Sequence, residues 1–234
     1  MAERVEKRAD VDVVLVDVDN TLLDFEPCSA WSIERACADT GVPYSERLAD
    51  TFLVCNEVFW RDIEKGKISR EEMYRSRFDV IFEKVGLAPH GGETFDEVYR
   101  SYLRESCFTV EGAEDLLAYL SPRYFVYAAT NASTAQQQNR LEKAGLLAYM
   151  KGLFVSDMFG AEKPRKAFFD GIFARLPGVL PSRTVMLGDS PNADVLGAKN
   201  YGMKAIWYNK NGRKRPSPVA DYTVSTLAEV KTIL

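Results

Sequence analysis

The chain has 234 residues, with 30 basic and 34 acidic side chains, a formal net charge of −4 and a single histidine. This length allows one large domain or two modest ones, and 46% hydrophobic with 27% charged residues is typical of a folded globular protein. The mild negative charge argues against broad binding to nucleic acid or anionic membranes. One histidine argues against histidine-rich zinc sites and histidine-based triads, so catalysis would rest mainly on carboxylates, lysine and backbone dipoles.

The cysteines and the N-terminus indicate where the protein works. The four cysteines form no C-x-x-C pattern, which favours small buried side chains in a reducing compartment over disulfides. The charged N-terminus lacks the apolar segment of a signal peptide, and no apolar run reaches the roughly 18 residues that a transmembrane helix needs. We therefore expect a cytoplasmic protein.

The first predicted element is a valine-rich strand over residues 11–18. A wholly helical stretch follows from about residue 26 to residue 106, because apolar residues recur there at helical spacing. Ser69 with Glu72 forms a capping-box pattern, which predicts that one of these helices begins at this point.

Beyond about residue 111 the predicted strands and helices alternate. We expect strands at 124–129, 153–156, 184–187, 204–207 and 222–224, and helices at 113–120, at 133–144, after Pro164, at 193–201 and from Thr226. This alternation predicts an α/β fold with a doubly wound parallel sheet. The earlier helical stretch is then an insertion: residues 1–24 and 108–234 form a Rossmann-like core, and residues 25–107 form an α-helical cap.

Two acidic residues follow the first predicted strand, in the sequence DVDNT at 17–21. Residues two apart on a strand point the same way, so Asp17 and Asp19 can share a pocket. One carboxylate could attack a substrate while the other transfers protons, provided that a metal ion offsets their repulsion. The alternative is a strand that runs into an ordinary turn, for which Asn20 is suited because asparagine tolerates left-handed backbone.

Thr130-Asn131 follows the second predicted strand, and Lys163-Pro164 lies just before the helix that follows the third. The hydroxyl and the helix-start amide of the first pair could bind an anion, although such residues also serve as ordinary helix caps. Proline is preferred at the first helical position, so Lys163 is expected at a helix start, where the helix dipole disfavours a cation. A fixed anionic partner would explain Lys163; the alternatives are a solvated surface lysine here and Lys166 as the functional lysine.

The sequence GDSPNAD at 188–194 follows the strand expected at 184–187. Mg²⁺ is commonly bound by one or two carboxylates together with water and substrate phosphate, which Asp189 and Asp194 could supply. The alternative is a helix N-terminus stabilised by acidic residues through the helix dipole. In doubly wound sheets ligands bind beyond the carboxyl ends of the strands. Acids, hydroxyls and a lysine at four strand ends suit phosphate and magnesium rather than acyl transfer.

The four motifs DVDNT, TN, KP and GDSPNAD, in this order, resemble those of the haloacid dehalogenase superfamily, and the resemblance covers nearly the whole chain. It implies that Asp17 is a nucleophile that forms an aspartyl-phosphate. Asp19 would protonate the leaving oxygen and then deprotonate the hydrolytic water. Thr130, Asn131 and Lys163 would bind the phosphate.

The resemblance also implies a Mg²⁺ cofactor. Its ligands would be Asp17, the backbone carbonyl of Asp19 and Asp189, with Asp194 supporting the ion directly or through water. Dehalogenases of this superfamily lack the second acid of the first motif, because no leaving alcohol needs a proton. Asp19 therefore indicates a phosphatase.

Three further segments, one of them VCNEVFWRDIEKGKIS in the cap, resemble nucleotidases that act on pyrimidine nucleoside monophosphates. We expect a phosphatase of small phosphomonoesters, most specifically of a nucleoside 5′-monophosphate, with neither a nucleic-acid polymer nor a membrane as partner. A sugar-phosphate phosphatase of the N-acylneuraminate-9-phosphate type is the alternative, and a mutase or a non-catalytic binding protein of the same fold are further ones. Ala132, where glycine is usual, and Pro191 depart from the usual motifs without removing a catalytic group.

Substrate specificity is expected to come from the cap. Trp60 and Arg61 are candidate substrate contacts, because an aromatic ring and a guanidinium can stack on and pair with a base or a sugar acid. Phe59 fits the apolar stripe of its helix and is expected in the core. His90 lies in a glycine-rich turn and is expected at the surface.

Overall fold

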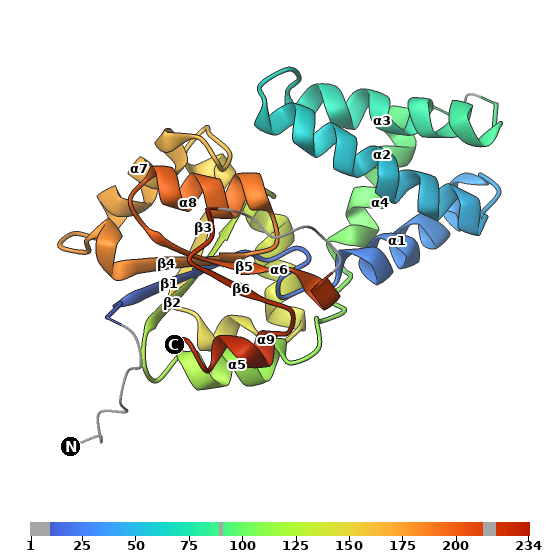
Figure 1. Cartoon of the computed structure of the whole chain (residues 1–234). Coiled ribbons are helices and arrows are strands. Elements are labelled where there is room, and N and C mark those ends of the chain that lie inside the picture. The colour runs from blue at the N-terminus through green and yellow to red at the C-terminus, as the bar shows by residue number, and fades with distance from the viewer. Residues whose placement is uncertain (1–9, 89–90, 213–218) are drawn as a thin grey trace. The chain divides into compact units, whose positions relative to one another are not determined.

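The computed structural model describes residues 10–88, 91–212 and 219–234 (Figure 1). His90, expected at the surface, lies outside the described residues, as does the charged N-terminal segment at 1–9.

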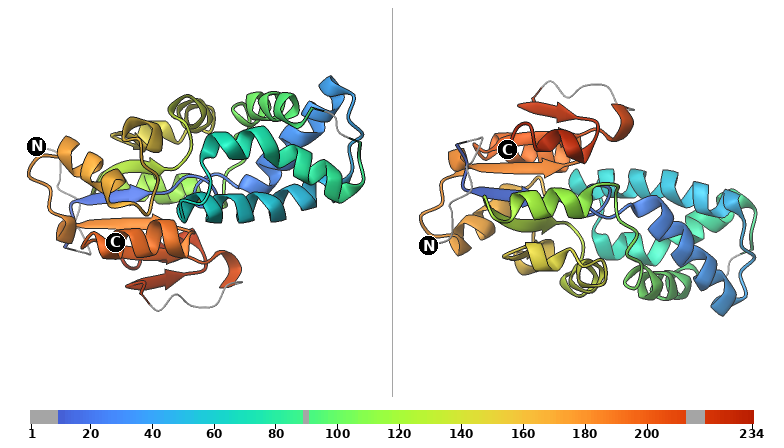
Figure 2. Two further views of the ribbon diagram at one scale, coloured as in Figure 1. Left: turned by 90° about the horizontal axis from the view of Figure 1, so that it is seen from above. Right: turned by 90° about the horizontal axis from the view of Figure 1, so that it is seen from below.

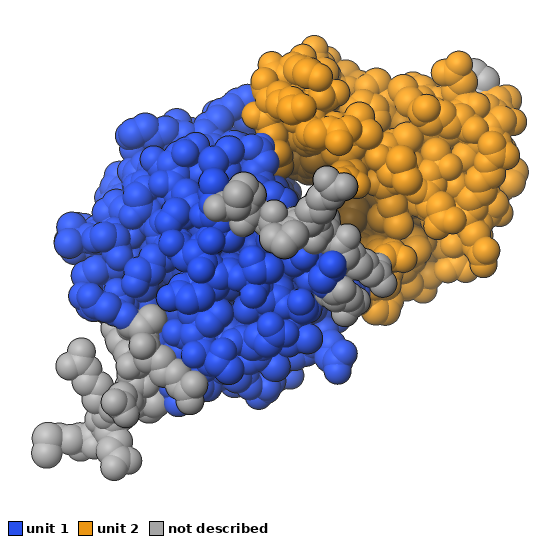
Figure 3. Space-filling model, in the orientation of Figure 1, with its two compact units in different colours: residues 1–24, 109–234 blue, residues 25–108 orange. Residues whose placement is uncertain are grey.

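The chain divides into two compact units (Figure 3). The first consists of Met1–Asp24 and Thr109–Leu234, and the second consists of Phe25–Phe108. The boundary on the return to the first unit therefore lies one residue later than the position expected from the sequence.

The first unit is built on a six-stranded sheet in the order β3-β2-β1-β4-β5-β6, in which every neighbouring pair of strands is parallel. The strands are β1 (Val13–Val16), β2 (Phe125–Thr130), β3 (Gly152–Val155), β4 (Thr184–Gly188), β5 (Lys204–Tyr208) and β6 (Tyr222–Val224). This is the strand order of a doubly wound sheet: from β1 the chain adds strands toward one edge, and from β4 it adds them toward the other. The predicted α/β class is confirmed.

Helices cover both faces of this sheet, as a parallel sheet requires. They are α5 (Ala113–Leu120), α6 (Thr134–Lys143), α7 (Lys166–Arg175), α8 (Gly197–Asn200) and α9 (Leu227–Val230), with short 3₁₀ helices at Leu147–Tyr149, Ser156–Met158, Pro181–Arg183 and Lys210–Gly212. Figure 1 shows α7 and α8 on one face and α5 and α9 on the other, and Figure 2 views them from above and below.

The central strand β1 explains this two-sided burial. Its successive side chains point to opposite faces, so Val14 and Val16 pack with leucines of α5, whereas Val13 and Leu15 pack with phenylalanines of α7. A run of four buried apolar residues is typical of such a strand.

The helix expected directly after Pro164 begins later. Its first residue is Lys166, with Arg165 as the N-cap residue, and the Lys163–Pro164 peptide bond is cis. The prediction that Pro164 occupies the first helical position is therefore wrong, and Lys163 does not lie at a helix start.

The helix expected over 193–201 also differs from the structure. It begins earlier, as a π-helical turn over Pro191–Leu196, and continues into α8. Ser190 caps this turn, because its Oγ accepts a hydrogen bond from the backbone N–H of Ala193 at 3.0 Å. Pro191 fits the first position, since proline lacks the N–H that would have no partner there.

The second unit contains the helices α1 (Phe25–Thr40), α2 (Glu46–Glu64), α3 (Arg70–Val85) and α4 (Gly92–Leu103). The predicted capping box opens α3: Ser69 Oγ accepts from the Glu72 N–H at 3.1 Å, and Glu72 Oε2 accepts from the Ser69 N–H at 2.7 Å. The apolar side chains of these helices share one core, against which Phe59 packs while partly buried.

The cysteines are all free, as predicted, and Cys107 is the one of the four that is not buried. Among the described residues, no helix combines the length and the apolar character needed to cross a membrane.

Candidate functional site

Three aspartates meet at the carboxyl ends of β1 and β4, where the strand order reverses and where doubly wound sheets bind their ligands. Asp17 directly follows β1, Asp189 directly follows β4, and Asp194 lies in the π-helical turn. One carboxylate oxygen from each lies within 4.8 Å of the other two. The structure thus brings together three of the side chains predicted to bind metal.

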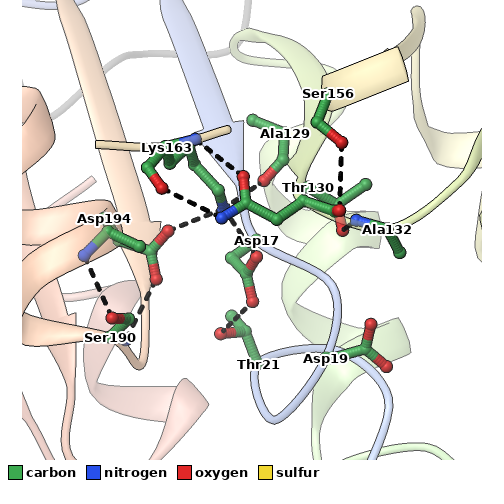
Figure 4. Close-up of polar contacts among 12 residues, drawn as sticks. Asp17, Asp19, Thr21, Ala129, Thr130, Ala132, Ser156, Lys163, Ser190 and Asp194 are labelled. Atoms are coloured by element: carbon green, nitrogen blue, oxygen red, sulfur yellow. Dashed lines mark hydrogen bonds and ion pairs between the residues drawn. The ribbon is translucent and has the colours of Figure 1, made fainter. Parts of the chain in front are cut away.

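Lys163 lies among these acids. Its ammonium Nζ is 2.7 Å from Asp17 Oδ1, 2.7 Å from Asp194 Oδ1 and 2.6 Å from the carbonyl oxygen of Ala129 (Figure 4). Burial by itself lowers the pKa of Lys163, but the two carboxylates outweigh burial and hold this pKa above its ordinary value. The anionic partners of Lys163 are therefore carboxylates of the chain itself.

Asp17 has the opposite electrostatic surroundings. Burial raises the pKa of Asp17 well above its ordinary value, and the negative charges of Asp194 and Asp189 raise it further, against the lowering effect of Lys163. Thr21 donates a hydrogen bond from Oγ1 to Asp17 Oδ2 at 3.3 Å. Because the neighbouring carboxylates of Asp194 and Asp189 oppose ionisation of Asp17, an additional cation near Asp17 is electrostatically favoured.

Asp194 is fixed from both sides. Oδ1 binds Lys163, and Oδ2 accepts a hydrogen bond from the backbone N–H of Ser190 at 3.0 Å. The carboxylate lies against Gly188, where a Cβ would overlap it. A glycine at the end of β4 is therefore required for this position of Asp194.

The pair Thr130-Asn131 divides into two roles. The Thr130 hydroxyl accepts hydrogen bonds from the backbone N–H of Ala132 and from Gln137 Nε2, both at 3.2 Å, so its own hydrogen can be donated to a ligand. Asn131 uses its side chain differently: Oδ1 accepts from the N–H of Lys163 at 2.8 Å, and Nδ2 donates to the carbonyl of Lys163 at 3.0 Å. The Asn131 side chain thus holds the backbone of Lys163, and the contact of Asn131 with phosphate stays a prediction.

Asp19 lies at a turn whose next residue, Asn20, has the left-handed backbone that its residue type allows (φ 64°). The Asp19 carboxylate points away from Lys163 in Figure 4. It is bound by α6: Arg140 Nη1 lies 2.6 Å from Oδ1, and Gln137 Nε2 lies 2.5 Å from Oδ2.

Gln137 and Arg140 were not predicted from the sequence. Both are fully buried, although residues of these types are usually exposed. The available signal was their spacing of three, which places two polar side chains on one face of a helix. The same spacing is common on solvated helix faces, so it does not by itself indicate a site.

Trp60 and Arg61 lie on α2 in the second unit. Trp60 is partly buried and Arg61 is exposed. Their contact with a substrate stays a prediction.

The group of three aspartates fits Mg²⁺. Hard oxygen ligands, carboxylates above all, are what this ion prefers, and the group contains no histidine or cysteine. Asp19 is the fourth predicted ligand, and its expected contribution is the backbone carbonyl, whereas its side chain is held by α6.

Comparison with known proteins assigns a family to this arrangement. Residues 11–202 match the family model of the haloacid dehalogenase-like hydrolases. The chain belongs to this hydrolase family. It is 36% identical over 197 residues to pyrimidine 5′-nucleotidase PynA of Streptococcus pneumoniae (strain ATCC BAA-255 / R6), covering 84% of this chain and 83% of PynA. It is 30% identical over 224 residues to pyrimidine 5′-nucleotidase YjjG of Escherichia coli (strain K12), covering 95% of this chain and 97% of YjjG.

A solved structure supports the same assignment. The magnesium-bound crystal structure of YfnB from Bacillus subtilis matches this haloacid dehalogenase-like hydrolase with a TM-score of 0.90 and 30% sequence identity. The match covers 96% of this chain and 98% of that one. The family resemblance and the predicted fold, a Rossmann-like core with a helical cap, are confirmed.

Proposed function

We propose that this hydrolase is a Mg²⁺-dependent phosphatase that cleaves small phosphomonoesters through an aspartyl-phosphate on Asp17. The observation that carries the proposal is the group of three aspartates at the strand ends, two of which bind the Lys163 ammonium. The names of PynA and YjjG support a pyrimidine nucleoside 5′-monophosphate as the substrate.

The ion would be held by the carboxylates of Asp17, Asp189 and Asp194, with the backbone carbonyl of Asp19 as the further ligand. When bound, Mg²⁺ supplies positive charge that keeps Asp17 ionised and offsets the negative charge of the phosphoryl group. Asp194 is the ligand whose contact is either direct or through water, because one of its oxygens already binds Lys163.

The side chains of the core can then carry out two displacements. A carboxylate oxygen of Asp17 attacks phosphorus, the bond to the ester oxygen breaks, and that oxygen takes a proton from Asp19. Water next attacks phosphorus and gives a proton to Asp19, the bond between phosphorus and Asp17 breaks, and inorganic phosphate leaves. Thr130 donates a hydrogen bond to a phosphoryl oxygen, and the positive charge of Lys163, whose three hydrogens already bind Asp17, Asp194 and the carbonyl of Ala129, stabilises the charge that develops there.

Asp19 is the residue that favours phosphate esters over haloacids. A leaving alkoxide needs a proton and a leaving halide does not, and a positioned acid contributes about 10²–10⁴-fold to such a step. Asp19 lies two residues beyond Asp17 and is solvent-accessible in part, with its side chain 25% exposed.

The test is a phosphate-release screen of the whole protein with pyrimidine and purine nucleoside monophosphates, sugar phosphates, N-acylneuraminate 9-phosphate and p-nitrophenyl phosphate. We expect pyrimidine monophosphates to have the highest kcat/KM, EDTA to abolish turnover and Mg²⁺ to restore it. A higher kcat/KM for sugar phosphates would replace the substrate proposed here. Hydrolysis that survives EDTA would contradict the metal dependence, and no phosphate release from any ester would contradict the phosphatase function.

A further inference from the structure

Two buried side chains of α6 hold the proposed acid–base residue from both of its oxygens. Arg140 Nη1 binds Asp19 Oδ1 and Gln137 Nε2 binds Asp19 Oδ2, at 2.6 and 2.5 Å. Neither Gln137 nor Arg140 takes part in the two displacements described above.

The burial of Arg140 is costly unless its charge is paired. Transfer of a guanidinium out of water is unfavourable, and arginine is almost never fully buried without a partner. Arg140 is fully buried, whereas the Asp19 side chain that it binds is 25% exposed. The pair therefore fixes the orientation of a partly exposed carboxylate from a rigid buried side, which favours a positioning role over simple packing.

Gln137 extends this arrangement to the phosphate-binding side of the site. Its Nε2 also donates to Thr130 Oγ1 at 3.2 Å, and its Oε1 accepts from Arg140 Nη1 at 3.2 Å. One amide thus touches both Asp19 and Thr130. These two groups must reach different oxygens of the same ester, Asp19 the leaving oxygen and Thr130 a phosphoryl oxygen.

We propose that Gln137 and Arg140 are positioning residues that set the place of the Asp19 carboxylate relative to the Thr130 hydroxyl. The proposal rests on the proposed function, because it assigns a role within that reaction. A displacement of about 1 Å at a reacting group can cost roughly 10²-fold in rate, so loss of the hydrogen bonds from Gln137 and Arg140 to Asp19 has a measurable effect.

The choice of substrate distinguishes positioning of the acid from general damage. An alkyl ester such as uridine 5′-monophosphate needs protonation of its leaving oxygen, whereas p-nitrophenolate leaves with little help. The ratio kcat/KM reports the steps up to formation of the phosphoenzyme, in which Asp19 acts as the acid. Impaired positioning of Asp19 therefore lowers kcat/KM for the nucleotide far more than for p-nitrophenyl phosphate.

The variants are Gln137→Met, which removes the donor at similar size, and Arg140→Lys, which keeps the charge but loses the planar fork. Gln138→Met is the matched control, because Gln138 is exposed on the same helix. We expect Gln137→Met to lower kcat/KM for uridine 5′-monophosphate about 10- to 100-fold and for p-nitrophenyl phosphate less than about threefold. Arg140→Lys has a smaller effect in the same direction, and Gln138→Met has none. Circular dichroism and thermal unfolding verify that each variant is folded.

The decisive comparison repeats Gln137→Met in an Asp19→Asn background. If Gln137 acts through Asp19, Gln137→Met causes no further loss of kcat/KM in protein that already carries Asp19→Asn. The same loss in both backgrounds, or equal losses for the two esters, would overturn the positioning role while the phosphatase function stands. Wild-type protein that releases phosphate from neither ester would instead refute the proposed function, and this role with it.

Discussion

Two buried cations, one in each unit, differ in what surrounds them, in addition to the buried Arg140 described above. Lys163 in the first unit binds the carboxylates of Asp17 and Asp194 at the end of the sheet. Arg77 in the second unit lies inside the helical core, where Nε binds Asp96 at 2.7 Å and Nη1 binds Asn56 at 2.8 Å.

The balance of charge separates these two centres. Asp96 is fully buried and also binds Arg100 at 2.5 Å, so in the second unit two guanidinium groups share one carboxylate. The guanidinium of Arg77 is further enclosed by aromatic rings, 5.1–5.5 Å from their centroids, of Phe52, Tyr74, Phe78 and Tyr99. In the first unit one ammonium binds two carboxylates, and a carboxylate oxygen of Asp189 lies within 4.8 Å of oxygens of both. A buried ion pair by itself therefore does not indicate a site, whereas three carboxylates gathered at strand ends do.

The largest effect is expected from Asp17→Asn, which tests whether the charged group of the first unit carries the chemistry. Loss of the nucleophile should lower phosphate release by at least about 10³-fold. Folding should persist, because Lys163 retains Asp194 and the carbonyl of Ala129. Steady-state kinetics measures phosphate release, and thermal unfolding measures stability. Asp170→Asn, which replaces an exposed aspartate, is the control. Normal turnover in Asp17→Asn would rule out the proposed nucleophile.

Next in size, Lys163→Met and Arg77→Met compare the two buried cations directly. Lys163→Met leaves buried carboxylate charge uncompensated and should cost about 3–5 kcal/mol of unfolding free energy. Arg77→Met should cost less, because Asp96 keeps its ion pair with Arg100. Mg²⁺ should restore part of the loss in Lys163→Met, because the ion would supply charge beside Asp17 and Asp194, and none of the loss in Arg77→Met. Denaturant unfolding with and without Mg²⁺, together with calorimetric Mg²⁺ binding, measures this difference. Equal rescue of the two variants would show that the comparison is mistaken.

Gly188→Ala should have an intermediate effect on the same centre. The added Cβ would overlap the Asp194 carboxylate and displace it from Lys163 and from the other two aspartates. We expect Mg²⁺ affinity to fall about 10-fold, with a stability loss of roughly 1–3 kcal/mol from overpacking. The control is Gly152→Ala, because a Cβ at Gly152 meets only ordinary van der Waals contacts. Gly145→Ala would not serve, because the φ of 73° at Gly145 is strained for alanine. Unchanged Mg²⁺ affinity would mean that the position of Asp194 is not critical.

The smallest effects concern the second unit. Trp60→Ala and Arg61→Ala should raise KM for uridine 5′-monophosphate a few-fold, about 1 kcal/mol or less each, and leave p-nitrophenyl phosphate nearly unchanged. The exposed side chain of Val58 on the same helix provides the control Val58→Ala. Equal changes for both esters would argue against contacts with the nucleoside.

The sequence predicts the ends of the strands well, for a physical reason. A buried parallel strand must be apolar throughout, so the acids that follow the apolar runs of β1 and β4 mark where each strand ends. Because parallel strands have their carboxyl ends on the same side of the sheet, Asp17, Asp189 and Asp194 are expected to lie close together there. The predictions for these residues required only local sequence and the rule for doubly wound sheets.

What could not be predicted depends on contacts between distant segments. The anionic partners of Lys163 lie 146 and 31 residues away in the sequence, and α7 begins at Lys166 instead of at Pro164. Gln137 and Asp19 are separated by 118 residues. No local pattern encodes such pairs, because each polar residue alone is equally compatible with solvent.

The central claim is that Asp17 becomes phosphorylated during turnover. The direct measurement is acid quenching of the wild-type protein within milliseconds of mixing with Mg²⁺ and uridine 5′-monophosphate, followed by mass spectrometry of its peptides. We predict a hydroxylamine-sensitive phosphoryl group on the peptide that contains Asp17, and its absence in Asp17→Asn. A protein that releases phosphate while this peptide stays unmodified, or that carries the phosphoryl group on another residue, would contradict the account.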